Sequence, residues 1–433
     1  MPDEPPRPDK PVPGVETGAS AALPRQLGVF DAVTIGLGSM VGAGIFVALA
    51  PAARAAGGAL LAGLAIAAVI AYCNATSSAR LAAAYPTSGG TYVYGRERLG
   101  PLWGYLAGWG FVVGKTASCA AMALTVGFYA WPEHPHAVAV AAVAALTAVN
   151  LVGVQKSAWL TRVIVAIVLA VLAAVIITGL GAHSVPAAEA GGSSPSAGGV
   201  LQAAGLLFFA FAGYARIATL GEEVRDPSRT IPKAIPIALG ITLAVYVLVA
   251  VAALNMLGAQ GLAESAAPLA QIATEAGAHW LTPVVRIGAV VAALGSLLAL
   301  ILGVSRTTLA MARDRYLPPV LAAVHPRFGV PHRAELGVGV VVAILAATTD
   351  IRAAIGFSSF AVLVYYAVAN ASAWTLSAQE GRPPRLIPIV GLAGCVIVAF
   401  ALPLSSILAG IAVFAVGIAA YGARRFGAAR KSP

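Results

Sequence analysis

Long apolar runs separated by short polar segments constrain the fold of this chain more than any other feature of its sequence. An α-helix that crosses a bilayer needs about 20 consecutive, mainly apolar residues. Charged residues make up only 10% of the chain, against roughly 25% in soluble domains. The sequence therefore predicts an all-α integral membrane protein with twelve transmembrane helices. We place them at 29–53, 58–83, 101–130, 136–154, 158–181, 199–222, 235–257, 283–311, 334–349, 353–376, 386–403 and 405–422.

The segments outside these spans are too short to fold as separate domains. Residues 1–26 are polar and rich in proline, so we expect a disordered tail there. They contain no apolar segment followed by a small-residue cleavage site, and we do not expect them to be a secretory signal. A basic tail is expected at 424–433, and a linker rich in glycine and serine at 191–199.

Lysine and arginine are concentrated in alternate loops. They collect in the N-terminal tail, in every second predicted loop and at the C-terminus, whereas the other loops hold almost none. Cytoplasmic loops of membrane proteins are enriched in these residues. We therefore expect a multi-pass protein of the plasma membrane with both termini in the cytoplasm. The net charge of +10 is explained by this topology and needs no nucleic-acid partner.

The side chains that commonly hold metals or perform catalysis form no recognisable pattern. Cys73, Cys119 and Cys395 all fall in predicted spans, so we expect free buried thiols. The histidines fall in loops or at span ends, and neither an H-E-x-x-H nor a G-x-S-x-G motif occurs. The sequence predicts neither an enzyme nor a protein with a bound metal or organic cofactor.

Two predicted spans contain residues that can interrupt a helix. Residues 35–46 include Gly36, Gly38, Gly42 and Gly44, and residues 205–223 include Gly213 in mid-span. Spans one and six occupy corresponding positions in two successive halves of five spans, which is the sequence pattern of transporters with inverted repeats. Close helix packing at small residues is the alternative explanation for the glycines.

A broken helix can bind a zwitterion at its two new ends. The half-helix that begins at the break offers free N–H groups and a positive dipole end, which suit a carboxylate. The half-helix that stops leaves free carbonyl groups, which suit an ammonium group or a metal cation. An amino acid matches both.

Four segments of the chain, in order, resemble sequence motifs of the amino acid–polyamine–organocation superfamily. Residues 38–46 resemble its first span, 85–94 the loop between spans two and three, 208–232 its sixth span and the following loop, and 312–318 the end of span eight. The motifs are closest to those of bacterial permeases similar to cationic amino acid transporters. The resemblance extends over about residues 27–425.

The resemblance implies a leucine-transporter-like fold built from a 5+5 inverted repeat and two further helices. The first repeat would cover 27–182, the second 199–376, and the last two helices 386–423. It also implies alternating access driven by a proton or sodium gradient, or by exchange.

The same resemblance assigns roles to residues around the two breaks. The substrate carboxylate would lie against Ser39, Met40, Val41, Gly42, Ala43 and Gly44. Its amino group would meet carbonyls of Phe209, Ala210, Phe211 and Gly213. Phe209 would act as an aromatic lid, and Glu222 and Glu223 would help to close an inner gate. A solvated helix end is the alternative for the two glutamates.

Two cations inside predicted spans depart from the familiar pattern. Cationic-amino-acid relatives often carry a lysine in span five, where this chain has Val168; it has instead Lys115 in span three and Arg216 in span six. A charge in mid-membrane costs at least ~2.5 kcal/mol, so both are functional candidates. We identify no Asp or Glu inside the spans to pair with them. Partial deprotonation of the lysine, a bound anion or freed carbonyls would each relieve the cost.

For Lys115 we favour a coupling role in which the desolvated amine gains and loses a proton. Tying carbonyls together and direct substrate binding remain alternatives. A guanidinium stays charged, so Arg216 would pin the broken helix or contact a carboxylate.

These features together predict a secondary active transporter for amino acids or related amines, with a proton as the coupling ion. A sodium symporter or an amino acid exchanger is the alternative within transport. A channel or a non-transporting membrane scaffold or sensor is the alternative from another class. The expected partners are a small-molecule substrate and the lipid bilayer, and the oligomeric state is left open.

Overall fold

The computed structural model describes residues 27–86, 89–153, 158–182, 196–218 and 223–429. Within this part of the chain every regular element is helical, and the single β-bridge joins Leu27 to Val224. The predicted tail at 1–26, most of the predicted linker and Glu222 lie outside the described residues. Of the predicted basic tail, 424–429 continue the last helix, whereas 430–433 also lie outside.

The helix bounds follow the apolar runs closely. In chain order the helices are α1 (Val29–Met40), α2 (Ala43–Val47), α3 (Leu49–Ala56), α4 (Leu60–Ala84), α5 (Thr91–Leu99), α6 (Pro101–Ala130), α7 (Pro135–Leu151), α8 (Ala158–Gly181), α9 (Ala197–Phe211), α10 (Ala215–Ala218), α11 (Pro227–Glu264), α12 (Pro268–Glu275), α13 (Leu281–Arg313), α14 (His332–Thr348), α15 (Ile351–Trp374), α16 (Leu386–Ala399) and α17 (Leu404–Ala429). Short 3-10 turns are η1 (Gly57–Ala59), η2 (Ala212–Tyr214) and η3 (Pro319–Ala322).

Within the described ranges, nine helical stretches are long and apolar enough to cross a membrane. The helices α7 and α16 are apolar but shorter. An all-helical membrane protein is therefore confirmed, while the count of twelve spans stays a prediction.

The largest difference from the predicted bounds is at α11. The predicted span covers 235–257, but the helix already begins at Pro227. Proline is well tolerated at the first position of a helix, because the N–H that it lacks has no partner there in any case. At the other end, Gly258 has a φ of 64°, which interrupts the helical path just after the predicted boundary.

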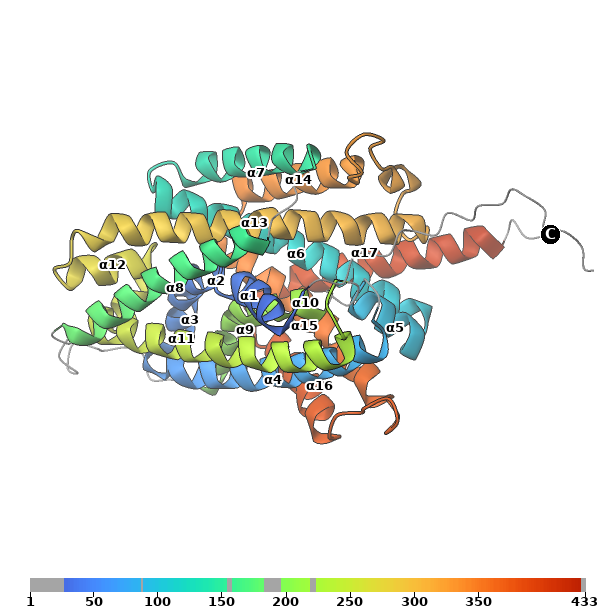
Figure 1. The fold of residues 1–433 in the computed structure, drawn as a ribbon, viewed down its shortest axis with the longest axis horizontal. Helices are drawn as coiled ribbons and strands as arrows, with labels where there is room; N and C mark the ends of the chain where they lie inside the picture. Colours follow the sequence, from blue (N-terminus) through green and yellow to red (C-terminus); the bar gives the residue numbers. More distant parts are fainter. Residues whose placement is uncertain (1–26, 87–88, 154–157, 183–195, 219–222, 430–433) are drawn as a thin grey trace, which may run out of the picture.

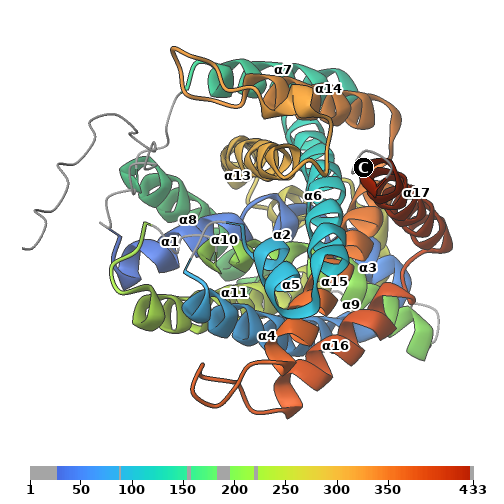
Figure 2. The same cartoon turned by 90° about the vertical axis from the view of Figure 1, so that its right-hand side faces the viewer.

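The broken helices occupy the middle of the molecule. Figure 2 looks along the bundle and shows α2 and α10 near its middle, with α1 running toward them between α8 and α11 and with α4, α6 and α13 on other sides. The helix α1 packs against α8 and α11, and α6 packs against α13 and α15. Outside this ring lie α7 and α14 as a pair, with α16 and α17 on other flanks. The interruptions are therefore shielded by full-length helices.

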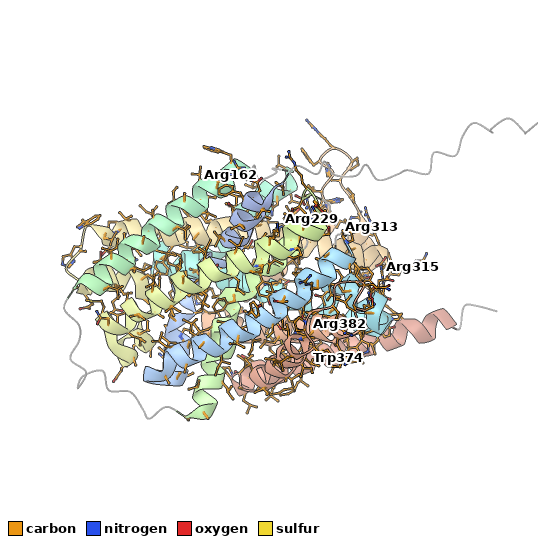
Figure 3. The ribbon with its side chains drawn as sticks, turned by 60° about the horizontal axis from the view of Figure 1, so that its bottom comes forward. Arg162, Arg229, Arg313, Arg315, Trp374 and Arg382 are labelled. Carbon is orange, nitrogen blue, oxygen red and sulfur yellow. The ribbon has the colours of Figure 1, made fainter. Side chains whose placement is uncertain are left out.

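The two ends of the bundle differ. We call them the α5 end and the α12 end, after the short helices at the right and left of Figure 1. Arginines from helix ends and loops gather toward the α5 end, including Arg229, Arg313, Arg315 and Arg382 (Figure 3). The C-terminal part of α17 projects at this same end (Figure 1).

Candidate functional site

The first interruption separates α1 from α2. The α1 helix ends at Met40 and α2 begins at Ala43, with Gly42 in a non-helical conformation between them (φ −87°, ψ −139°). Gly44 lies so close to α9 that an added Cβ would be 2.7 Å from the Ala210 Cα. A Cβ on Gly42 would collide with the Ser296 side chain. These glycines therefore allow the chain to pack closely against α9 and α13, in addition to interrupting the helix.

The second interruption follows α9. This helix ends at Phe211, and the chain passes through η2 before the one-turn helix α10. A Cβ on Gly213 would overlap the Ser39 carbonyl group and lie 2.7 Å from the Met40 nitrogen. The two breaks predicted from the sequence are therefore in direct contact.

A buried tyrosine joins the two breaks. The Tyr246 hydroxyl, on α11, lies 2.5 Å from the Met40 carbonyl oxygen and 3.0 Å from the Ala210 carbonyl oxygen. The two carbonyls, one at the end of each interrupted helix, share the single proton of this hydroxyl. Tyr246 was not among the predicted site residues, although a lone tyrosine within an aliphatic span was a usable signal.

Lys115 points at a carbonyl freed by the second break. Its side chain is only 8% exposed, and Nζ donates a hydrogen bond to the Ala212 carbonyl oxygen at 3.2 Å. The Tyr366 hydroxyl also donates to this oxygen, at 3.4 Å. Freed carbonyls were one of the three ways by which we expected a buried cation to be accommodated.

A cavity of ≈ 420 Å³ lies beside the two breaks. Several predicted site residues line it, namely Ser39, Val41, Phe209, Gly213, Lys115, Arg216 and Glu223. Met40, Gly42, Ala43, Gly44, Ala210 and Phe211 are buried in the packing around the breaks and are not among the residues that line this cavity. Val168, at the position where relatives often carry a lysine, is part of the wall.

The charge of Arg216 is compensated in a way that the sequence did not show. The Glu223 carboxylate attracts this guanidinium, whereas the Arg306 guanidinium repels it. We expected no acidic partner inside the spans, and Glu223 indeed lies just beyond span six in sequence, although it lines the same cavity as Arg216.

One face of α13 forms a long wall of the cavity. Its lining residues recur at helical spacing and are mostly small: Ala292, Gly295, Ser296, Ala299, Leu300, Gly303, Arg306, Thr307 and Ala310. The Ser296 hydroxyl donates to the Gly38 carbonyl oxygen at 3.3 Å, which ties this wall to the first break. Arg306 is the charged residue on this face, and sequence analysis did not single it out.

The protein is tightly packed between the breaks and the α12 end. The Tyr129 hydroxyl donates to the Phe46 carbonyl oxygen at 2.9 Å, and both side chains are completely buried. Arg286 donates in turn to the Tyr129 carbonyl oxygen at 3.2 Å. Toward the α5 end, the cavity wall continues to Leu27 and Ala310.

Two of the four recognised motifs meet at the α5 end. Tyr92 from residues 85–94 donates a hydrogen bond to Asp314 from residues 312–318. Arg96 pairs with the same carboxylate at 3.0 Å. Burial and the Asp314 carboxylate raise the pKa of Tyr92 well above its usual value, so the phenol stays protonated and can donate. This cluster fixes α5 to the end of α13.

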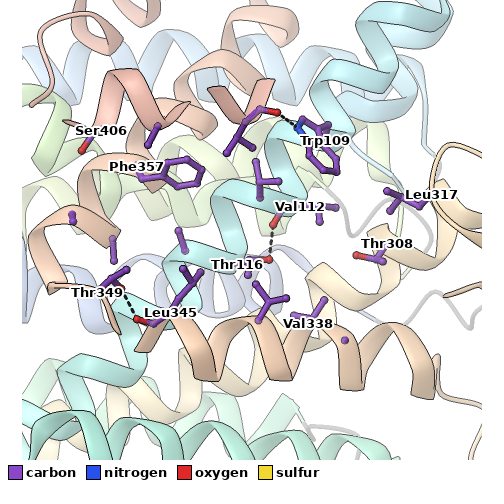
Figure 4. A pocket seen from close by; sticks show the side chains of 18 of the residues that line it. Trp109, Val112, Thr116, Thr308, Leu317, Val338, Leu345, Thr349, Phe357 and Ser406 are labelled. Carbon is purple, nitrogen blue, oxygen red and sulfur yellow. Dashed lines mark hydrogen bonds between the residues drawn. The ribbon is translucent and has the colours of Figure 1, made fainter. Parts of the chain in front are cut away.

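A larger hollow of ≈ 790 Å³ lies elsewhere, between α6, α13, α14, α15 and α17. Its wall is apolar apart from hydroxyl and indole groups such as those of Trp109, Thr116, Thr308 and Ser406 (Figure 4). No charged side chain is among the described residues that line it. We therefore take the smaller cavity, which contains the charged groups and the helix breaks, as the candidate site.

Comparison with known proteins identifies the family to which the chain is similar. A family model described as amino acid permease matches residues 27–421. Uncharacterized transporters of Mycobacterium tuberculosis and Mycobacterium bovis are 74% identical over 404 residues, covering 93% of this chain and 92% of their own length. The human cationic amino acid transporter 4 is 30% identical over 84% of this chain and 61% of its own length. A branched-chain amino acid permease of Bacillus subtilis is 26% identical over 87% of this chain.

Proposed function

Because this chain belongs to the amino acid permease family, whose members are transporters and not enzymes, we propose that it moves amino acids or related amines across the plasma membrane by alternating access, coupled to protons. One observation carries the proposal: two interrupted helices touch each other beside a cavity in the middle of an otherwise regular bundle. Such breaks expose backbone groups of both polarities, which a zwitterion needs.

We assign the fold to the leucine-transporter type, with repeats at 27–182 and 199–376 and two further helices within 386–423. The contact between Gly213 and the Ser39 carbonyl supports this assignment, because the breaks of spans one and six are expected to face each other in such a fold. The twelve-span topology is part of the same proposal.

The substrate's carboxylate is assigned to the segment from Ser39 to Gly44, and its amino group to the carbonyls between Phe209 and Gly213. Ser39 and Phe209 line the cavity, which supports both assignments. Phe209 acts as the lid over the substrate. Glu223, with Glu222 outside the described residues, belongs to the inner gate.

We assign proton coupling to Lys115. Its hydrogen bond to Ala212 links the charge of the amine to the backbone at the second break. Loss of the proton removes that charge and weakens the contact, so protonation and the conformation of the break are coupled. Arg216 has a structural role beside Glu223, where it holds the chain that follows the break.

The orientation follows from the distribution of arginine. With both termini in the cytoplasm, the α5 end faces the cytoplasm, because its arginine-rich loops belong on that side. The dense packing at the α12 end then closes the outer side, and the structure corresponds to an inward-facing state.

Two of the relatives are named for different classes of substrate. One is named for cationic amino acids and another for branched-chain amino acids, so a set of test substrates should include both classes.

A two-stage experiment tests the proposal. Purified protein is first screened for thermal stabilisation by amino acids and amines, and uptake into proteoliposomes is then measured under an imposed pH or sodium gradient. We expect at least one amino acid to stabilise the protein and to accumulate under a pH gradient. Accumulation with sodium alone would identify a sodium symporter, and uptake only against preloaded amino acid would identify an exchanger. Absence of stabilisation and of uptake would refute transport of amino acids.

A further inference from the structure

The charges around the cavity set a limit on which amino acids it can hold. The charged side chains among its described lining residues are Lys115, Arg216, Arg306 and Glu223, which are three cations and one carboxylate. The effective dielectric constant is lower within a protein than in bulk water, so these charges act more strongly on a ligand in the cavity than they would in solution. A cavity with this balance attracts anions and repels a second positive charge.

Two of the three cations already have defined neighbours. The Lys115 ammonium donates to the Ala212 carbonyl oxygen. Arg216 faces the Glu223 carboxylate. Neither group is therefore needed to explain how a ligand is recognised.

Arg306 differs from both. Its side chain is exposed, and it forms no hydrogen bond or ion pair with another residue in the part of the chain that the structure describes. Glu335 attracts it from α14, but this glutamate is completely buried (0% exposed) and is not part of the cavity wall. The donors of the guanidinium thus remain available to a ligand.

The surroundings of Arg306 fit a small group that reaches it from the breaks. On the same face of α13, Gly303 and Ala299 lie about one and two turns back toward Ser296, which is hydrogen-bonded to Gly38 near the first break. Small residues leave this stretch of wall clear between the breaks and the guanidinium. A guanidinium binds a carboxylate through two parallel hydrogen bonds, which gives both affinity and orientation.

We propose that the cavity selects an amino acid with a negatively charged side chain, and that Arg306 is the residue that recognises this charge. This inference rests on the proposed function, because it assumes that the shared backbone part of the amino acid is held at the two breaks. It distinguishes this chain from the relative that is named for cationic substrates.

The test compares ligands that differ in charge but little in size. Binding of L-glutamate, L-glutamine and L-arginine to the purified full-length protein is measured by thermal shift and by titration, with inorganic phosphate as a control for any anion. We expect L-glutamate to bind about 10- to 100-fold more tightly than L-glutamine. This ratio corresponds to the contribution of one hydrogen-bonded ion pair to the binding affinity. L-Arginine should bind most weakly.

Substitution of the recognising residue provides the second part of the test. In Arg306→Gln, we expect the preference for L-glutamate over L-glutamine to disappear while L-glutamine still binds. Arg306→Lys should retain a reduced preference, because it keeps the charge but not the paired donors. Arg313→Gln is the matched control, since Arg313 is exposed on the same helix outside the cavity and its loss should leave the preference unchanged.

The outcomes separate this inference from the proposed function. If L-glutamine or L-arginine binds as tightly as L-glutamate, the selectivity is refuted while amino acid transport stands. If phosphate stabilises the protein as much as L-glutamate, the cavity binds anions without selecting an amino acid, and the inference also fails. A preference for L-glutamate that persists in Arg306→Gln would refute the role of Arg306. If no amino acid binds, the proposed function itself is refuted.

Discussion

At the scale of single residues, the site depends on polar side chains that satisfy carbonyls freed by the helix breaks. Lys115 and Tyr366 donate to Ala212, and Tyr246 donates to Met40 and Ala210. In an apolar interior an unsatisfied carbonyl is costly, so these donors compensate for the interruptions. Each donor can also respond to substrate, because it contacts the backbone that the substrate would use.

The proposed coupling role of Lys115 gives the first prediction. In Lys115→Ala, we expect uptake driven by a pH gradient to fall to the level seen without a gradient, because the side chain that exchanges the proton is gone. The measurement is uptake into proteoliposomes with and without an imposed pH difference. Lys233→Ala, at an exposed position of α11, is the control and should behave as wild type. Uptake that stays fully driven by pH in Lys115→Ala would rule out this coupling role.

The bridge made by Tyr246 gives the second prediction. In Tyr246→Phe, two buried carbonyls lose a donor, and we expect a loss of stability of about 1–3 kcal/mol together with weaker substrate binding. Thermal unfolding with and without substrate measures both effects. Tyr72→Phe, at a half-exposed position of α4, should change neither. Unaltered stability in Tyr246→Phe would mean that other donors or water satisfy these carbonyls.

At the scale of the elements, the two interrupted helices are held together by close backbone contact. Gly44 touches Ala210, and Gly213 touches Ser39, so each break packs against the other helix without an intervening side chain. The Gly42 contact with Ser296 adds α13 to this arrangement. Movement of either break would therefore involve the other, which is consistent with the alternating access that we propose.

The contact at Gly213 gives the third prediction. In Gly213→Ala the new methyl group would overlap the Ser39 carbonyl, so the breaks must separate, and we expect uptake to fall about tenfold or more. Gly240→Ala is the matched control, because a Cβ there meets nothing within 4 Å in the helix α11. That variant should keep wild-type uptake. Equal uptake in both variants would show that close contact of the breaks is not required.

At the scale of the whole molecule, the two ends of the bundle have different structures. Between the breaks and the α12 end, Phe46 and Tyr129 are completely buried, whereas the cavity wall runs toward the arginine-rich α5 end. This asymmetry predicts from which side of the membrane the cavity can be reached.

Labelling of a cavity residue gives the fourth prediction. In Thr307→Cys we expect a membrane-impermeant thiol reagent to react in inside-out vesicles and not in right-side-out vesicles, because Thr307 lines the cavity that opens to the proposed cytoplasmic end. Glu275→Cys, exposed at the α12 end, should show the opposite pattern. The native cysteines are buried and should contribute little background. The reverse labelling of both positions would invert the proposed topology.

The sequence predicted the helices well because their signal is local. An apolar run of sufficient length is visible without knowledge of its neighbours, and most observed bounds agree with those runs. The breaks were also predictable, since glycines such as Gly42 and Gly213 stand out within apolar segments. The expected free and buried state of the three cysteines was confirmed for the same reason.

The surroundings of the charges were not predictable in the same way. Arg306 lies in span eight before the motif at 312–318, and its importance appears only when α13 is placed beside the breaks. The neighbour of Arg216 was missed because Glu223 lies beyond the predicted span in sequence, although it lines the same cavity. Tyr246 is separated by many residues from Met40, whose carbonyl it contacts.

By itself, the sequence determined that this protein is an all-helical membrane protein of the permease family with two interrupted helices. Those properties depend on the length of apolar runs, on the positions of glycines within them and on short motifs. Each of these features lies within a single segment of the chain. Only the tertiary structure decided which carbonyls are satisfied, which cations are compensated and which face of α13 lines the cavity. Hydrogen bonds and charges act over a few ångströms, so they depend on how distant segments pack and not on the order of residues along the chain.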